Sequence, residues 1–161
     1  MTEASGLEAL EPWAEHFLAD LGPGERRKVF RKIGQMLRQR NSDRIKANVD
    51  PDGNAMPARR PHLDKRGRIK SRARKGPMFR KLGLARNLRI TTDADQVEVA
   101  FVRNVAAAAA VHHFGLVDAV DKRIPNSIRV RYAARRLLGL PPADREAILD
   151  TMIDWLDKAG R

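Results

Sequence analysis

Apolar residues recur at three- and four-residue steps in two neighbouring stretches near the N-terminus, which is the spacing of one face of an α-helix. The first stretch covers residues 7–21, and the second covers residues 25–48 and carries a strongly basic opposite face. Residues 22–24, Gly-Pro-Gly, interrupt the pattern, and residues 50–53, Asp-Pro-Asp-Gly, have the composition of a turn. The pattern therefore predicts two amphipathic helices followed by a turn.

A change of period in the middle of the chain predicts a β-hairpin followed by a helix. Residues 87–92 have a strand-like composition, and residues 96–102 alternate apolar and polar side chains, as a strand with one buried face does. Residues 103–114 contain five consecutive alanines, and alanine is the best helix former. We expect this helix to end at Gly115.

The C-terminal part predicts one more strand and one more helix. After a polar loop, alternation over residues 127–132 indicates a third strand, and residues 143–158 place their large apolar side chains on one helical face. The predicted fold class is α+β, with amphipathic helices packed on a small antiparallel sheet. At 161 residues the chain has the size of one domain, so we expect a single folded unit over residues 1–161.

Residues 54–77 do not fit any element. They hold three prolines, two glycines and few large apolar side chains, so they cannot bury enough surface to offset the entropy lost on ordering. We predict a long, flexible, extended basic arm, inserted between the second helix and the hairpin.

The net charge of +12 is concentrated in and beside this arm. Eleven basic side chains fall between residues 59 and 81, against one acidic side chain: Arg59, Arg60, Lys65, Arg66, Arg68, Lys70, Arg72, Arg74, Lys75, Arg80 and Lys81. Such a cluster favours contact with phosphates or with an acidic protein surface over a merely solvated loop. The arm lacks aromatic residues for base stacking, so any contact with DNA would be nonspecific.

Motifs for metal binding are weak. The chain has no cysteine, which excludes disulfides, thiolate zinc sites and cysteine nucleophiles and suits a reducing cytoplasm. His112 and His113 are adjacent, so on a helix they point about 100° apart and cannot share one ion. The acidic turn at residues 50–54 opens like a calcium loop, but it has Ala55 where glycine is needed and Pro61 where glutamate belongs. No cofactor or metal is therefore expected.

Catalytic motifs are also weak. The acidic residues of the last helix, Asp144, Glu146, Asp150, Asp154 and Asp157, are best explained as a solvated face. No glycine-rich phosphate loop and no apolar run of membrane-spanning length is visible, and the N-terminus lacks a basic signal region. We expect a protein that is not an enzyme and has no membrane contact.

Several stretches, in this order and spacing, resemble the phage virion morphogenesis family, the tail completion proteins of Mu-like and related contractile-tailed phages. The similar stretches are Arg44-Ile45 through Asp50-Pro51-Asp52-Gly53, Met56-Pro57-Ala58-Arg59 with the basic arm ending at Met78-Phe79, Val111-His112-His113-Phe114-Gly115, Tyr132-Ala133-Ala134-Arg135, and Leu138-Gly139-Leu140. In one departure, Ala133-Ala134 stands where relatives often have proline.

The resemblance implies a structural protein that is made in the host cytoplasm and then becomes part of the virion. It would form a ring in the neck, sixfold like the tail, that completes the tail and joins it to the head. Its partners would be other copies of itself and neck, tail-terminator or connector proteins. The main alternative is a nonspecific nucleic-acid-binding accessory phage protein, for which the basic composition speaks.

Besides the arm, the interface candidates are Val111, His112, His113, Phe114, Gly115, Tyr132, Arg135 and Leu138. For the last three of these, an interface role and core packing are equally open.

Overall fold

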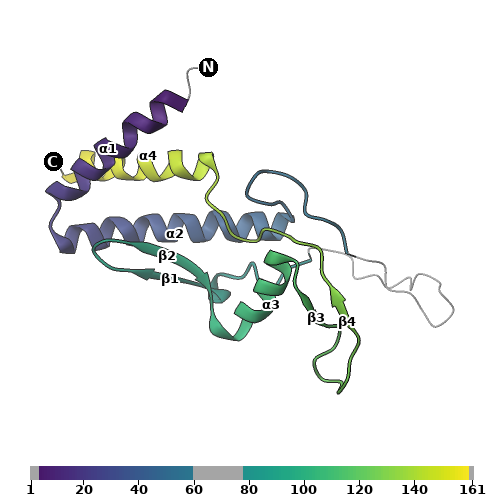
Figure 1. The fold of residues 1–161 in the computed structure, drawn as a ribbon. Coiled ribbons are helices and arrows are strands. Elements are labelled where there is room, and N and C mark those ends of the chain that lie inside the picture. The colour runs from purple at the N-terminus through teal and green to yellow at the C-terminus, as the bar shows by residue number, and fades with distance from the viewer. Residues whose placement is uncertain (1–3, 60–77, 160–161) are drawn as a thin grey trace. The chain divides into compact units, whose positions relative to one another are not determined.

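The computed structural model describes the backbone of residues 4–59 and 78–159, with side chains from residue 12 onward (Figure 1). It contains, in chain order, α1 (Ala4–Asp20), α2 (Pro23–Ala47), the 3-10 turn η1 (Ala85–Asn87), β1 (Leu88–Thr92), β2 (Val97–Phe101), α3 (Arg103–Phe114), β3 (Val117–Ala119), β4 (Arg129–Arg131) and α4 (Pro142–Ala159). The predicted α+β class is confirmed. The predicted single sheet is wrong, because the strands form two separate two-stranded sheets, β1-β2 and β3-β4.

The chain divides into two compact units. Unit 1 comprises Met1–Arg40, Arg89–Ala100 and Leu140–Arg161, and unit 2 comprises Asn41–Leu88 and Phe101–Gly139. Each unit has its own apolar core. That residues 1–161 act as a single domain stays a prediction.

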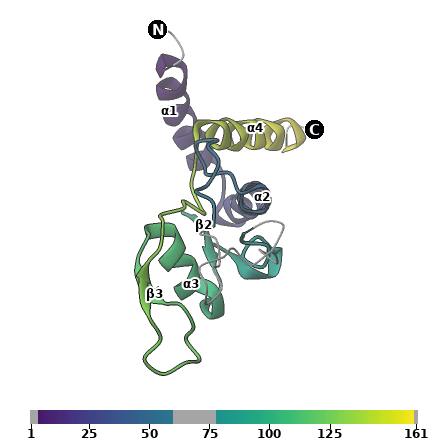
Figure 2. The same cartoon turned by 90° about the vertical axis from the view of Figure 1, so that its right-hand side faces the viewer.

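Unit 1 is built around the first part of α2. Phe17 of α1, Phe30 and Ile33 of α2 and Met152 of α4 are all buried in its core. Figures 1 and 2 show α1 and α4 on one side of α2 and the β1-β2 hairpin on the other. The hairpin approaches α2 at Gly34, where an added Cβ would lie 2.6 Å from a methyl carbon of Ile90. Only glycine permits this approach.

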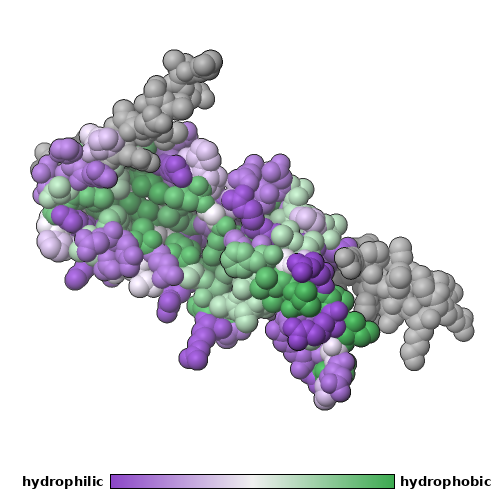
Figure 3. Space-filling model, viewed as in Figure 1, coloured by the Kyte–Doolittle hydropathy of each residue, from purple (hydrophilic) through white to green (hydrophobic). Residues whose placement is uncertain are grey.

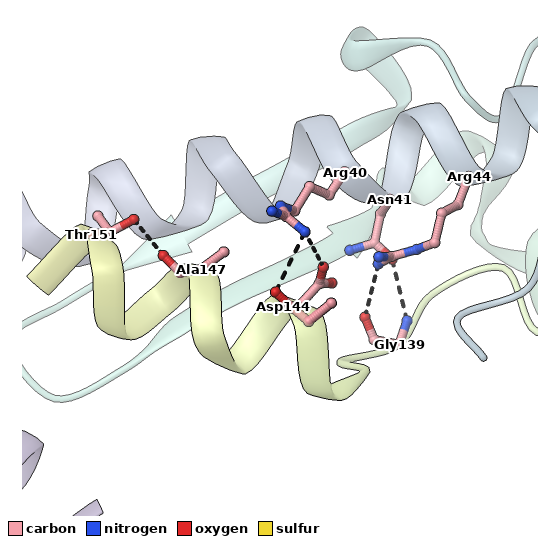
Figure 4. Close-up of polar contacts among 8 residues, drawn as sticks. Arg40, Asn41, Arg44, Gly139, Asp144, Ala147 and Thr151 are labelled. Carbon is pink, nitrogen blue, oxygen red and sulfur yellow. Dashed lines mark hydrogen bonds and ion pairs between the residues drawn. The ribbon is translucent and has the colours of Figure 1, made fainter. Parts of the chain in front are cut away.

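An ion pair anchors the start of α4 to α2. Arg40 lies 3.2 Å from Asp144, whose side chain has no exposed surface (Figure 4). Lys32 and Asp154 make a second, looser contact at 4.0 Å. The interpretation of the α4 carboxylates as one solvated face is therefore wrong for Asp144, because its charge is compensated inside the protein.

Unit 2 packs the last turns of α2 against the chain around residues 78–88 and against α3. Its core contains Ile45, Phe79, Leu82, Ala109 and Leu137, all buried, with Met56 beside them. The buried hydroxyl of Ser42 donates to the carbonyl oxygen of Gly83 at 2.5 Å. Figure 4 also shows Asn41 and Arg44 on the two sides of the Gly139 peptide group. The buried side chains of Asn41 and Ser42 are thus paired with backbone groups.

The predicted start of the arm at residue 54 falls in a packed part of unit 2. The predicted acidic turn is present: Gly53 donates its amide to the Asp50 carbonyl oxygen at 3.1 Å, and Asn54 donates its amide to the Asp50 carboxylate at 2.8 Å. The chain then pairs Val49 with Ala55 and buries Met56. Residues 60–77, the rest of the predicted arm, lie outside the described residues.

Strand β3 was not predicted; it lies in what we expected to be a polar loop. It pairs antiparallel with β4, with Val117 opposite Arg131 and Ala119 opposite Arg129. The predicted strand at residues 127–132 is confirmed as β4. Strand β3 has only three residues, Val-Asp-Ala, and is too short for alternation to reveal it.

Candidate protein-docking site

The end of α3 is fixed to the chain that follows β4, and Gly115 makes this possible. Gly115 has φ 66°, and an added Cβ would lie 2.9 Å from the backbone nitrogen of Ala134. The position therefore excludes other residues both by conformation and by space. Two hydrogen bonds also join the end of α3 to the chain after β4. Arg135 donates its amide to the His112 carbonyl oxygen at 2.8 Å, and Leu137 donates its amide to His113 Nδ1 at 3.2 Å.

His112 is held between two aromatic rings. Its ring centroid lies 5.0 Å from that of Phe79 and 4.9 Å from that of Tyr132, both in edge-to-face geometry. Its Nδ1 is buried without a hydrogen-bond partner. Burial, followed by the positive charges of Arg135 and Arg59, lowers the pKa of His112, so its ring is neutral at pH 7. His112 thus serves packing in the neutral form.

Arg135 holds residues 57 and 58, which precede the arm, against the rest of unit 2. It is 7% exposed, and its guanidinium donates to the carbonyl oxygens of Pro57 at 2.7 Å and Ala58 at 3.0 Å. Arg59, the next residue, donates to the carbonyl oxygen of Met78. The residues that flank the undescribed segment are thereby brought together. Arg135 acts inside the protein, and a direct contact of its side chain with a partner stays a prediction.

Three of the eleven predicted arm residues are described, and all three are exposed: Arg59, Arg80 and Lys81. The other eight, Arg60, Lys65, Arg66, Arg68, Lys70, Arg72, Arg74 and Lys75, lie outside the described residues. Their role as a partner-binding set stays a prediction.

The predicted interface residues gather in unit 2 but differ in exposure. Phe114 is 67% exposed, whereas Tyr132 is half-buried against His112 and Leu138 is half-buried against the core. Val111 supplies the carbonyl oxygen that caps α3. Phe114 is therefore the member of the set best placed to meet another protein.

Sequence reasoning missed a second exposed apolar surface, on the β3-β4 hairpin. Its large exposed side chains are Leu116, Val117, Val120, Ile124 and Ile128. Apart from the adjacent pair Leu116 and Val117, they are separated in the sequence by polar residues, alanine or proline, so they form no long apolar run. Only the pairing of β3 with β4 groups these side chains. Strand β3 has three residues, too few for an alternating pattern to predict it.

The two units carry opposite charge. Unit 1 has eleven Lys and Arg against fourteen Asp and Glu, a net −3, and unit 2 has twenty-one against six, a net +15. These values account for the whole +12 of the chain. A basic unit and a slightly acidic unit in one chain can attract each other between copies.

Two further findings concern ions and membranes. Among the described residues, no group of three or more His, Asp or Glu is arranged to hold a metal ion. The helices in the described part of the chain all fall short of the length and apolar character of a membrane span.

Comparison with known proteins identifies the family. The model of the phage virion morphogenesis family matches residues 6–157, which include both units. The chain belongs to this family. Its place is therefore in virion assembly, as the resemblance of its motifs implied.

A named relative agrees with the family match. The chain is 29% identical over 144 residues to "Tail completion protein S" of Escherichia phage P2, and the alignment covers 88% of this chain and 91% of that protein. No solved structure matches the chain significantly. The aligned length shows that this family member and its relative correspond over nearly their whole chains.

Proposed function

We propose that this protein is a structural, non-enzymatic component of the phage neck that completes the tail and joins it to the head. It would act by protein contacts in a ring of identical copies, with neck, tail-terminator or connector proteins as neighbours. The relative of similar length named as a tail completion protein supports the tail role. The proposal places the protein in the host cytoplasm during assembly and then in the virion.

The observation that carries the proposal is the family match over residues 6–157, and the geometry of unit 2 agrees with it. Polar side chains there hold backbone segments in place: the buried Arg135 holds residues 57 and 58, and the half-buried His113 holds the chain after β4. The exposed side chains of this unit include the apolar Phe114 and the basic Arg59, Arg80 and Lys81. Fixed backbone with exposed apolar and charged side chains suits docking to protein surfaces.

Deletion of the gene from its phage or prophage tests the proposal. We expect the lysate to contain DNA-filled heads and separate tails, with few joined particles in electron micrographs. Purified protein added to this lysate should restore joined particles. Normal numbers of joined particles without the protein would refute the proposal, and so would its absence from purified virions by mass spectrometry.

The second candidate is a nonspecific nucleic-acid-binding accessory protein, favoured by the net +15 of unit 2. Phosphate contacts release counterions, so this function predicts duplex binding that weakens steeply with salt and does not depend on base sequence. Titrating the purified protein with labelled DNA at 50 and 200 mM salt checks it. Tight binding together with normal head–tail joining in the deletion would favour this candidate.

A further inference from the structure

The β3-β4 hairpin leaves an apolar surface exposed at the end remote from α3. Val120 donates its amide to the Ile128 carbonyl oxygen at 3.0 Å, and Tyr132 donates to Leu116 at 3.1 Å, so the ladder extends past both strands. By the two-residue alternation of strands, these four side chains share one face. Tyr132 covers its end of that face by packing on His112, whereas Ile128 remains 76% exposed.

Contact with a second surface stabilises such a hairpin. A two-stranded sheet is marginally stable in water unless another surface covers it. The apolar side chains at its tip, Val120, Ile124 and Ile128, are each more than half exposed. In Figure 3 the hairpin, at the lower right of the molecule, carries apolar surface among polar side chains. Grouped apolar side chains on a protein surface mark contact sites.

The outer face of α4 has the complementary character. Ile153 is 43% exposed and Leu156 is 39% exposed. By helical spacing, Glu146, Asp150 and Asp157 lie on the same outward face as Ile153, and all three are exposed. On this face Ile153 lies between Leu156 on one side and the three acidic residues on the other, so apolar and acidic side chains stand next to each other.

The hairpin is basic around its apolar side chains. Between residues 116 and 132 there are four basic and two acidic residues. Lys122 pairs with Asp118 and Arg123 pairs with Asp121, so the basic excess of the hairpin is Arg129 and Arg131, both exposed. Two hairpins would repel each other, and so would two α4 faces. A hairpin and an α4 face attract each other, because their net charges are opposite. Complementary charges beside apolar contacts determine which surfaces pair.

We propose that the β3-β4 hairpin of one copy docks on the outer face of α4 of the next copy. The occupant of the hairpin surface is thus a second copy of this chain. Because the two surfaces differ, the contact is head-to-tail and leaves one surface of each kind for further copies, as a ring requires. This inference rests on the proposed ring and assigns the residues that close it.

The absence of cysteine from the chain permits a direct test by cross-linking. Ile128→Cys and Ile153→Cys place single thiols on the two exposed surfaces. Tails purified from phages carrying the variants are treated with a short bis-maleimide. We expect the double variant to give a ladder of multimers, a mixed population of the two single variants to give dimers, and each single variant alone to give none.

The matched control is the double variant Ala19→Cys and Ala108→Cys, whose sites are exposed on α1 and α3. It should give no ladder. Homodimers from Ile128→Cys alone would show hairpin pairing instead and overturn the proposal. So would cross-links from Ile128→Cys to a different virion protein, or no cross-link in tails whose micrographs show a ring of this protein. If the micrographs show no ring of this protein on the tails, the proposed ring is wrong, and so is the interface that depends on it.

Discussion

Replacing Arg135 with methionine should loosen the chain that leads into the arm while leaving the rest of unit 2 folded. The guanidinium holds the carbonyl oxygens of Pro57 and Ala58 at 2.7 and 3.0 Å. Methionine keeps an unbranched apolar stem and removes both of these hydrogen bonds, together with a local one to the carbonyl oxygen of Ala133 at 3.2 Å. The packed segment around Met56 then loses its link to the chain after β4.

The structure sets the size of the effect. A hydrogen bond from a charged donor contributes about 1.5–3 kcal/mol. The low end applies to both bonds here, because Pro57 and Ala58 are exposed and water can reach their oxygens once the arginine is gone. Removing a buried charge also relieves its desolvation, so we expect a net loss of about 2 kcal/mol. That energy corresponds to roughly a 30-fold change in an opening equilibrium.

Hydrogen exchange measured by mass spectrometry reports this opening directly. The Met56 amide donates to the Asn48 carbonyl oxygen at 2.8 Å, so its exchange is slow in the closed state. In the Arg135→Met variant we expect exchange of a peptide covering residues 54–59 to rise by roughly 30-fold. Urea unfolding should show a loss of about 2 kcal/mol.

The neighbouring residue supplies the control. Arg136 is exposed and pairs with Asp52 at the surface, so Arg136→Met should change stability by less than about 1 kcal/mol and leave the exchange of residues 54–59 unchanged. Arg135→Met with the same exchange as the unmodified protein would show that the guanidinium does not hold this segment.

Three substitutions in the packed parts of the chain and one replacement of the arm give further tests. Gly115→Ala should lower the free energy of unfolding in urea by at least about 2 kcal/mol. The loss should exceed that of Gly53→Ala, because the Gly53 site also has positive φ but has open space around it. Equal losses would show that the close contact with Ala134 contributes nothing. Asp144→Ala should cost about 2 kcal/mol, because it removes the ion pair that holds the start of α4 to α2, and an unchanged melting curve would contradict this. The pKa values of His112 and His113 are both lowered in the folded state, chiefly by burial, so stability should be full above pH 6.5 and fall as the pH drops below it; His112→Gln should reduce this dependence, and an identical pH profile would oppose it. Replacing residues 60–76 with a flexible linker of about four residues, which spans at most about 13 Å, should keep the fold and abolish head–tail joining; normal infectious yield would argue against an assembly role for the arm.

The local sequence pattern was sufficient to predict those elements whose own residues favour one secondary structure. Residues 103–114 were predicted with the bounds that α3 has, because a run of alanines favours a helix and Gly115 ends it. The last helix was likewise found from its apolar face and matches α4 to within one residue at each end. These signals lie within the element and need no knowledge of its partner.

Features that depend on distant partners were not predictable. Asp144 was expected in water, and its burial depends on Arg40, 104 positions earlier in the chain. Arg135 sits in a basic stretch that resembles surface, and its burial depends on two carbonyl oxygens 77 and 78 positions away. The hairpin surface depends on the pairing of β3, which is three residues long. A single sequence carries no signal for such pairings.

The most direct test of the tail role is joining in vitro. Heads and tails from the deletion strain are mixed with purified protein, and infectious particles are counted. We expect infectivity to appear only with added protein. Protein that is added to the tails first should be sufficient, even when the excess is removed before the heads are added. Equal infectivity with and without the protein would contradict the account.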